Sequence, residues 1–149
     1  MEASRIFAAV MRLYSDAGYA CLPEFSLRTN RRPDITCLNK QGHIIMIEVK
    51  SSLQDFRTDQ KWQDYQEWAD AFYFAVGDDF PAEVLPDDSQ CGIIITDGYD
   101  CHITQDAPPH KLAGTRRSHL TRRLAYTAMM RHYHLGLPDK AAIKSGNKT

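Results

Sequence analysis

The chain has 149 residues, enough for one domain with a hydrophobic core and too few for two ordinary domains. Hydrophobic residues make up 43% and charged residues 25%, which excludes the composition typical of a disordered chain. The net charge of −1 conceals a division, because residues 1–110 carry 9 Lys and Arg against 18 Asp and Glu, and residues 111–149 carry 9 against 1.

The chain begins with a pattern that predicts a helix followed by a strand. Apolar residues recur at helical spacing over residues 6–17, and Gly18 is a typical helix stop. Residues 21–28 are then expected to form a strand with Phe25 and Leu27 on one face.

The next two predicted strands bring charged side chains together. One strand starts at Asp34, the other spans residues 44–50, and the polar residues 39–42 predict a hairpin connection between them. The two strands are therefore antiparallel neighbours. Because alternate side chains of a strand share a face, we expect Glu48 and Lys50 to leave the hydrophobic strand together.

A helix and a parallel strand are expected next. Residues 51–56 predict a loop, after which Thr58 or Asp59 can cap a helix. The apolar stripe of this helix consists of Trp62, Tyr65 and Ala69. The aromatic run 72–76 predicts a strand, and a strand reached through a crossover helix usually joins the same sheet in parallel.

The rest of the chain predicts a loop, a hairpin and a long helix. Residues 77–90 have the composition of a surface loop, and no catalytic residue is expected there. Asp97-Gly98 is a strong signal for a β-hairpin. A second long helix is expected from about residue 115 to residue 134. The prediction is a single α/β domain over residues 1–138, with residues 139–149 as a flexible tail.

Two carboxylates and a main-chain carbonyl in this arrangement suit a divalent metal ion. Mg²⁺ or Mn²⁺ takes oxygen ligands, and Asp34, Glu48 and the carbonyl of Val49 can supply them. Such an ion can activate water and stabilise the charged transition state of phosphodiester hydrolysis. Lys50 would lie beside the attacking water. The residues equally allow Glu48 and Lys50 to be a charged pair that ends a core strand.

A longer pattern surrounds these residues. It consists of Arg31-Arg32-Pro33-Asp34, Glu48-Val49-Lys50-Ser51-Ser52, Asp55-Phe56, Asp59, Lys61-Trp62, Tyr65, Asp70 and Phe72-Tyr73-Phe74-Ala75-Val76. This combination resembles the MmcB family of bacterial DNA-repair proteins, within the PD-(D/E)XK nuclease superfamily of restriction endonucleases and Holliday-junction resolvases. The resemblance runs from about Glu24 to Phe80, and more loosely to Arg116-Arg117.

The resemblance implies a restriction-endonuclease-like αβββαβ core with a mixed sheet, to which the predicted hairpin and the basic C-terminal helix are added. It also implies a metal ion at Asp34 and Glu48 and a water-orienting Lys50. Superfamily members often have a further metal-binding acid, and Glu24 matches such a position, whereas Glu2 fits only by location. Glu24 can equally be an outward polar residue of an edge strand. An auxiliary polar residue is implied on the second helix, where Lys61 is preferred and Gln60 is the reserve.

Basic residues on both sides of the acidic centre are expected to contact DNA. Arg31 and Arg32 precede the centre and can hold a phosphate backbone. Lys61 and Tyr65 are four residues apart and are expected to share a helix face. The basic face of the C-terminal helix, opposite Leu120 and Leu124, contains Arg116, Arg117, Arg122, Arg123 and Arg131. A solvated basic helix is the alternative.

The four cysteines form no CxxC pair, and the first residues lack the basic start and apolar core of a signal peptide, which predicts a cytoplasmic location. No apolar run approaches the roughly 18 residues that cross a bilayer, so no membrane partner is expected. Zinc ligands can be drawn from Cys91, Cys101 and His110, or from His132 and His134, but these spacings match no standard zinc finger. Small buried thiols are the preferred interpretation of the cysteines.

The sequence therefore leaves two alternative functions open. The first is a Mg²⁺- or Mn²⁺-dependent DNA endonuclease that acts in repair on damaged, mismatched or branched DNA. The second is a DNA-binding or assembly module of a repair complex that keeps the fold and contributes little cleavage. The resemblance to resolvases, which cut paired strands as dimers, also allows a homodimer and other repair proteins as partners.

Overall fold

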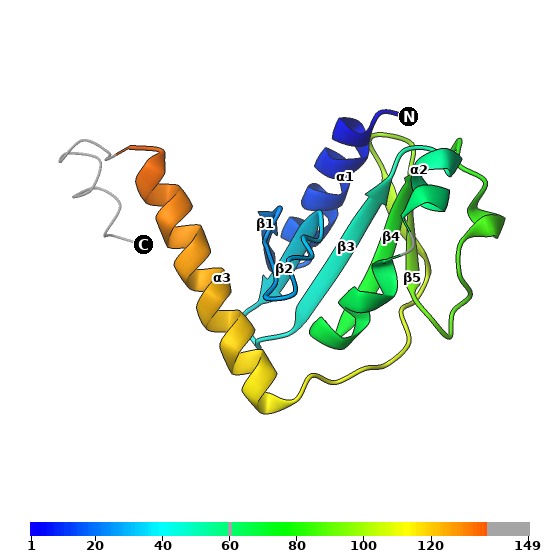
Figure 1. Ribbon diagram of the computed structural model, residues 1–149. Coiled ribbons are helices and arrows are strands. Elements are labelled where there is room, and N and C mark those ends of the chain that lie inside the picture. The colour runs from blue at the N-terminus through cyan, green and yellow to red at the C-terminus, as the bar shows by residue number, and fades with distance from the viewer. Residues whose placement is uncertain (60, 137–149) are drawn as a thin grey trace.

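A six-stranded mixed sheet forms the centre of the molecule (Figure 1). The computed structural model describes residues 1–59 and 61–136. The strands lie side by side in chain order as β1 (Tyr19–Pro23), β2 (Ile35–Asn39), β3 (Ile44–Lys50), β4 (Ala71–Gly77), β5 (Gly92–Thr96) and β6 (Cys101–Gln105). Strands β3, β4 and β5 are parallel, and the remaining pairs are antiparallel. The predicted α/β class, the αβββαβ order and the added hairpin are confirmed.

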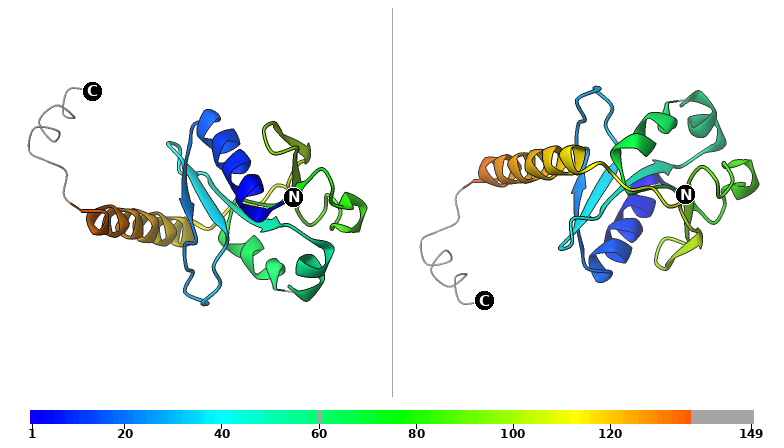
Figure 2. Two further views of the ribbon diagram at one scale, coloured as in Figure 1. Left: turned by 90° about the horizontal axis from the view of Figure 1, so that it is seen from above. Right: turned by 90° about the horizontal axis from the view of Figure 1, so that it is seen from below.

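Helices cover both faces of this sheet (Figure 2). Helix α1 (Ala3–Asp16) packs Ile6 and Val10 against one face. The short helix α2 (Leu53–Thr58) and the 3₁₀ helix η1 (Trp62–Trp68) lie on the other face, and a second 3₁₀ turn, η2, spans Ala82–Val84. Each buried aliphatic or aromatic side chain stabilises the fold by about 1.5–3 kcal/mol.

Strand β3 contains Glu48 and Lys50, the two residues predicted to share a face. All seven of its residues are buried, as expected for a central strand with a parallel neighbour. Met46 packs in the core under η1, and Ile45 and Ile47 pack in the core under α1. Glu48 and Lys50 follow Met46 at two-residue steps, so the strand directs both to one face as predicted.

The first strand differs from the prediction. Strand β1 ends at Pro23 because Glu24 adopts a left-handed backbone conformation with φ 51°. Phe25 and Leu27 are buried, but they enter the core from the loop that follows rather than from a strand. Alternation of apolar residues over 21–28 is therefore a packing pattern of a loop.

The second helix also differs from the prediction. The expected loop over residues 51–56 contains the start of α2, where the Ser52 side chain accepts a hydrogen bond from the Asp55 amide at 3.1 Å. The expected continuous helix is replaced by η1, in which Trp62, Tyr65 and Trp68 recur every third residue and are buried. Lys61 precedes η1 and is exposed, so it does not share a face with Tyr65.

Helix α3 (Gly114–His134) is confirmed as the long C-terminal helix and projects from the sheet edge (Figures 1 and 2). Leu120 and Leu124 are its buried residues, and they pack in the core under η1. Among the described residues, no helix has the length and apolarity needed to span a membrane. The predicted tail over 139–149 lies outside the described residues.

Candidate functional site

Asp34 and Glu48 meet where β2 begins beside the end of β3. The Asp34 amide donates to Glu48 Oε1 at 3.1 Å, and the Val49 amide donates to Asp34 Oδ2 at 2.7 Å. These crossed hydrogen bonds fix both carboxylates on neighbouring strands, as the sequence predicted. Each carboxylate keeps one oxygen that these bonds do not use.

Lys50 lies beside this pair and is almost fully buried, with 4% of its surface exposed. Its Nζ donates to Asp59 Oδ2 at 2.7 Å and lies 3.8 Å from Glu48 Oε2 and from Asp55 Oδ1. Asp59 also accepts the Lys61 amide at 3.1 Å, so the start of η1 is tied to the same cluster. From the sequence, Asp55 has no predicted role and Asp59 only that of a helix cap, although both belong to the family pattern.

Burial and neighbouring charges shift the pKa values of the ionisable side chains in this cluster. Burial and the neighbouring Asp34 charge raise the pKa of Glu48 to about 8. Burial also raises the pKa of Asp34, although the Val49 amide and Lys50 oppose the shift. Burial alone would lower the pKa of Lys50, but Asp59 and Glu48 outweigh it and raise that pKa. Lys50 is therefore a cation at neutral pH rather than a general base.

These side chains open into a cavity of about 350 Å³. Its lining combines the strand ends with the start of α1 and of α2, and it consists of Ala3, Phe7, Glu24, Asp34, Glu48, Val49, Lys50 and Asp55. The cavity brings together four of the predicted metal-site positions, because Glu24, Asp34, Glu48 and Val49 all line it. It is large enough for a hydrated ion and a phosphate group.

A hydrated divalent cation fits this donor set. Two crowded carboxylates with raised pKa values gain stability from a nearby cation. The N–H and C=O groups of a strand residue point to the same neighbour, so the Val49 carbonyl lies on the Asp34 side with its amide. Within residues 1–59 and 61–136, no three His, Cys, Asp or Glu side chains form a ready metal cage. Mg²⁺ does not need one, since it retains much of its water.

Glu24 lies at the rim of the cavity rather than deep within it. Its amide donates to the Asp34 carbonyl at 2.9 Å, and its carboxylate is 3.8 Å from Arg32 Nη2 with 62% of the side chain exposed. The left-handed turn at Glu24, not an edge strand, sets this direction. If a metal ion were held by Asp34 and Glu48, Glu24 would lie at the edge of its site.

Comparison with protein families gives a match over residues 1–139 to the MmcB-like model, described as DNA repair protein MmcB-like. The chain belongs to this family. The resemblance seen in the sequence is thereby confirmed, and the chain is placed among DNA repair proteins.

Two solved structures are also similar to this MmcB-like chain. A protein of unknown function from Silicibacter pomeroyi, SPO1766, is 38% identical over 91% of each chain, with a TM-score of 0.84. A repair endonuclease from Pyrococcus abyssi is 16% identical over 66% of this chain and 41% of its own, with a TM-score of 0.33. This value is too low to indicate a shared fold or function. No curated protein matches the chain.

The predicted DNA contacts near the centre of this MmcB-like chain have different surroundings. Arg31 Nε bonds Asp64 at 2.9 Å, whereas Arg32 is 58% exposed beside Glu24. Tyr65 is buried with its ring stacked on Phe72, so its ring face is not available to a base. Of these predicted contacts, Arg32 and Lys61 are exposed.

The predicted basic face of α3 is largely turned toward the protein. Arg117 forms two 2.6 Å bonds to the Asp70 carboxylate, and Arg116 lies over the Trp68 ring at 4.2 Å. Arg123 donates to the Ser26 carbonyl at 2.8 Å, and Arg131 donates to the Glu24 carbonyl at 2.7 Å. The expectation of five arginines on one outer face is wrong, because long side chains reach back past Leu120 and Leu124.

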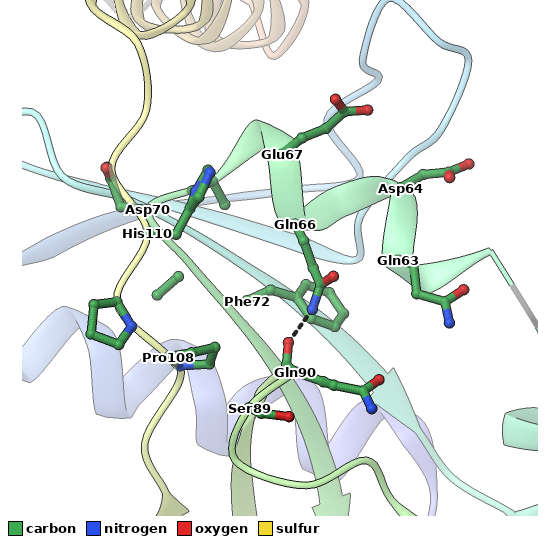
Figure 3. A pocket seen from close by; sticks show the side chains of 13 residues that line it. Gln63, Asp64, Gln66, Glu67, Asp70, Phe72, Ser89, Gln90, Pro108 and His110 are labelled. Carbon is green, nitrogen blue, oxygen red and sulfur yellow. Dashed lines mark hydrogen bonds between the residues drawn. The ribbon is translucent and has the colours of Figure 1, made fainter.

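A second cavity of about 440 Å³ lies between η1 and the segments before β5 and after β6 (Figure 3). Gln66 bonds the Gln90 carbonyl across it, and the His110 ring bonds the Ala69 carbonyl at 2.8 Å. Asp70 also lines this cavity, but its carboxylate is held by Arg117. The cavity lacks a free carboxylate pair beside a lysine, and the described residues include no zinc cluster at the cysteines.

Proposed function

We propose that this protein is a metal-dependent deoxyribonuclease that hydrolyses phosphodiester bonds in damaged, mismatched or branched DNA. One observation supports the proposal above all: the partly buried carboxylate of Asp34, the buried carboxylate of Glu48 and the buried lysine Lys50 converge on one cavity. Membership of a DNA repair family supports DNA as the substrate. Strongly shifted pKa values in a cavity are typical of functional sites.

The metal ion we propose is Mg²⁺ or Mn²⁺, held by Asp34, Glu48 and the Val49 carbonyl, with Glu24 at the rim. When bound, it would neutralise phosphate charge and lower the pKa of water. The crossed hydrogen bonds orient both carboxylates before any ligand arrives, which lowers the reorganisation needed for the reaction.

Lys50 orients the attacking water and stabilises negative charge on the phosphate. Its Nζ is positioned by Asp59 at 2.7 Å, so its ammonium is directed without free rotation. Arg32 and Lys61 are exposed beside the centre and are proposed to bind adjacent phosphates. Arg31 is proposed to support this surface while paired with Asp64.

The test is a cleavage assay on nicked, abasic, mismatched and branched DNA with Mg²⁺ or Mn²⁺. We expect Asp34→Asn and Lys50→Met each to lower the cleavage rate at least about 100-fold. Asp34→Asn is also expected to weaken Mn²⁺ binding in calorimetry. The matched control is Asp88→Asn, which changes an exposed acid in the loop before β5 and should cleave as the wild type does.

Cleavage that is equal in Asp34→Asn and the wild type would remove this centre from the reaction. DNA binding without Asp34-dependent cleavage on any of the substrates would favour the assembly module instead.

A further inference from the structure

A cluster of basic side chains lies on α3, apart from the carboxylates. His119, Arg122 and Arg123 occupy positions i, i+3 and i+4 of this helix and therefore share a face. Together with Tyr126 and Thr127 they line a shallow cavity of about 480 Å³. No carboxylate lines this cavity.

Two polar atoms in this cluster are buried without a partner among the described residues, namely His119 Nε2 and Arg123 Nη1. The guanidinium of Arg123 is held in place, because Nη2 bonds the Ser26 carbonyl at 2.8 Å and the group lies over the Phe25 ring. An unsatisfied buried polar atom costs folding free energy. A ligand with acceptor oxygens would recover this free energy.

The positive charge of the cluster is not balanced by the protein. Burial, and then the guanidinium groups of Arg28, Arg123 and Arg122, lower the pKa of His119. Arg28 lies two residues after Ser26, whose carbonyl Arg123 bonds. Arg28 and Arg122 are exposed, and no ion pair joins either to an acid within the described part of the chain. This distinguishes them from Arg117, whose charge is matched by Asp70.

We propose that Arg28, His119, Arg122 and Arg123 form a second phosphate-binding site that holds the DNA backbone away from the cleavage centre. This inference rests on the proposed function, since it takes DNA as the ligand. Guanidinium and imidazole donors match the tetrahedral oxygens of a phosphodiester. Tyr126, which is 69% exposed beside the cavity, adds an aromatic surface of the kind that nucleic acids contact.

The chain itself links the two sites. Arg28 belongs to the loop between β1 and β2, and the same loop carries Glu24 at one end and Arg32 and Asp34 at the other. A backbone bound on α3 can therefore continue along this loop to the carboxylates. The second site would set where the substrate lies and would not take part in the chemistry.

The experiment measures binding of a fluorescent DNA duplex in EDTA over a range of salt concentrations. The Arg28→Gln/Arg122→Gln variant changes two exposed side chains and is compared with Lys40→Gln/Lys111→Gln, which removes the same charge at other exposed positions. We expect the first variant to lower the slope of log affinity against log salt by about two and to weaken binding about tenfold or more at low salt. The control should retain the wild-type slope.

Unchanged slope and affinity in Arg28→Gln/Arg122→Gln, with DNA binding by the wild type intact, would overturn the second site and leave the proposed function standing. Equal losses in both double variants would also overturn it, because the effect would then be general charge. Absence of DNA binding by the wild type at low salt would overturn the proposed function itself. Thermal melts of the three proteins serve as the folding control, and we expect them to match.

Discussion

At the scale of single residues, Lys50 lies 3.8 Å from Glu48, and main-chain amides hold both Asp34 and Glu48. Each accepts one amide hydrogen bond across the gap between β2 and β3. Their rotamers are therefore determined by the strand pairing, and the pair is ready for a cation when the sheet has formed. Sequence could predict this juxtaposition because a hairpin fixes which residues face each other.

The raised pKa of Glu48 predicts how stability depends on pH without metal. Between the ordinary value of 4.5 and the folded value of about 8, the folded protein keeps a proton that the unfolded chain has lost. Stability in EDTA should therefore fall as pH rises through this window, by on the order of 4 kcal/mol. Glu48→Gln should remove most of this decline, as measured by urea unfolding at pH 5 and pH 8.

A comparison with Glu83→Gln, an exposed acid in η2, controls for the loss of a charge. Added Mn²⁺ should flatten the decline in the wild type, because the cation stabilises the ionised pair. A decline of equal size in Glu48→Gln would assign it to other groups.

The sequence could not predict the partners of Lys50. Asp55 and Asp59 reach its ammonium only because α2 starts at Leu53 and the chain then turns into η1. The position of that turn depends on the packing of Trp62 and Tyr65, not on local spacing. The same dependence explains why Lys61 and Tyr65 were wrongly expected to share a helix face.

At the scale of elements, prediction succeeded where burial has a regular period and failed where tertiary contacts decide. Strands β3 and β4 are apolar runs whose length and flanking residues indicate strands rather than helices. The end of β1 depends on a left-handed Glu24, a conformation that residue type alone does not indicate. The direction of the α3 arginines depends on acceptors from distant parts of the chain.

The contact between Arg117 and Asp70 attaches α3 to the sheet. Asp70 is buried and also accepts the Ile44 amide at 2.8 Å; burial opposes its ionisation, but the Arg117 and amide hydrogen bonds outweigh burial and lower its pKa to about 2. Arg117→Met should cost about 3–5 kcal/mol because it leaves a buried carboxylate without its cation. Arg122→Met, at an exposed position of the same helix, should change stability by less than about 0.5 kcal/mol.

Urea unfolding at pH 7 measures both variants. The difference between Arg117→Met and the wild type should shrink as pH falls from about 4 to 2, where Asp70 takes up a proton. Equal stabilities at pH 7 would show that the pair does not attach the helix.

At the scale of the whole molecule, α3 completes the core as well as adding charge. A chain that ends after residue 113 lacks Leu120, Leu124 and Arg117, all of which contact the main body. The loss should exceed about 5 kcal/mol, enough to unfold a domain of ordinary stability. Circular dichroism should show no cooperative melt for this chain, and a chain that ends after residue 136 should retain one. A normal melt of the shorter chain would make α3 an independent arm.

The contacts of Arg131 relate the cavity to the order in which the chain is synthesised. Arg131 donates from near the end of α3 to the carbonyls of Pro23 and Glu24, and so supports the turn that places Glu24 at the rim of the cavity. Synthesis proceeds from the N-terminus, so Asp34 and Glu48 leave the ribosome long before Arg131 does. A chain interrupted before Arg131 would carry Asp34 and Glu48 without the contact that supports the Glu24 turn, so the rim of the proposed centre would form only after α3 has been synthesised.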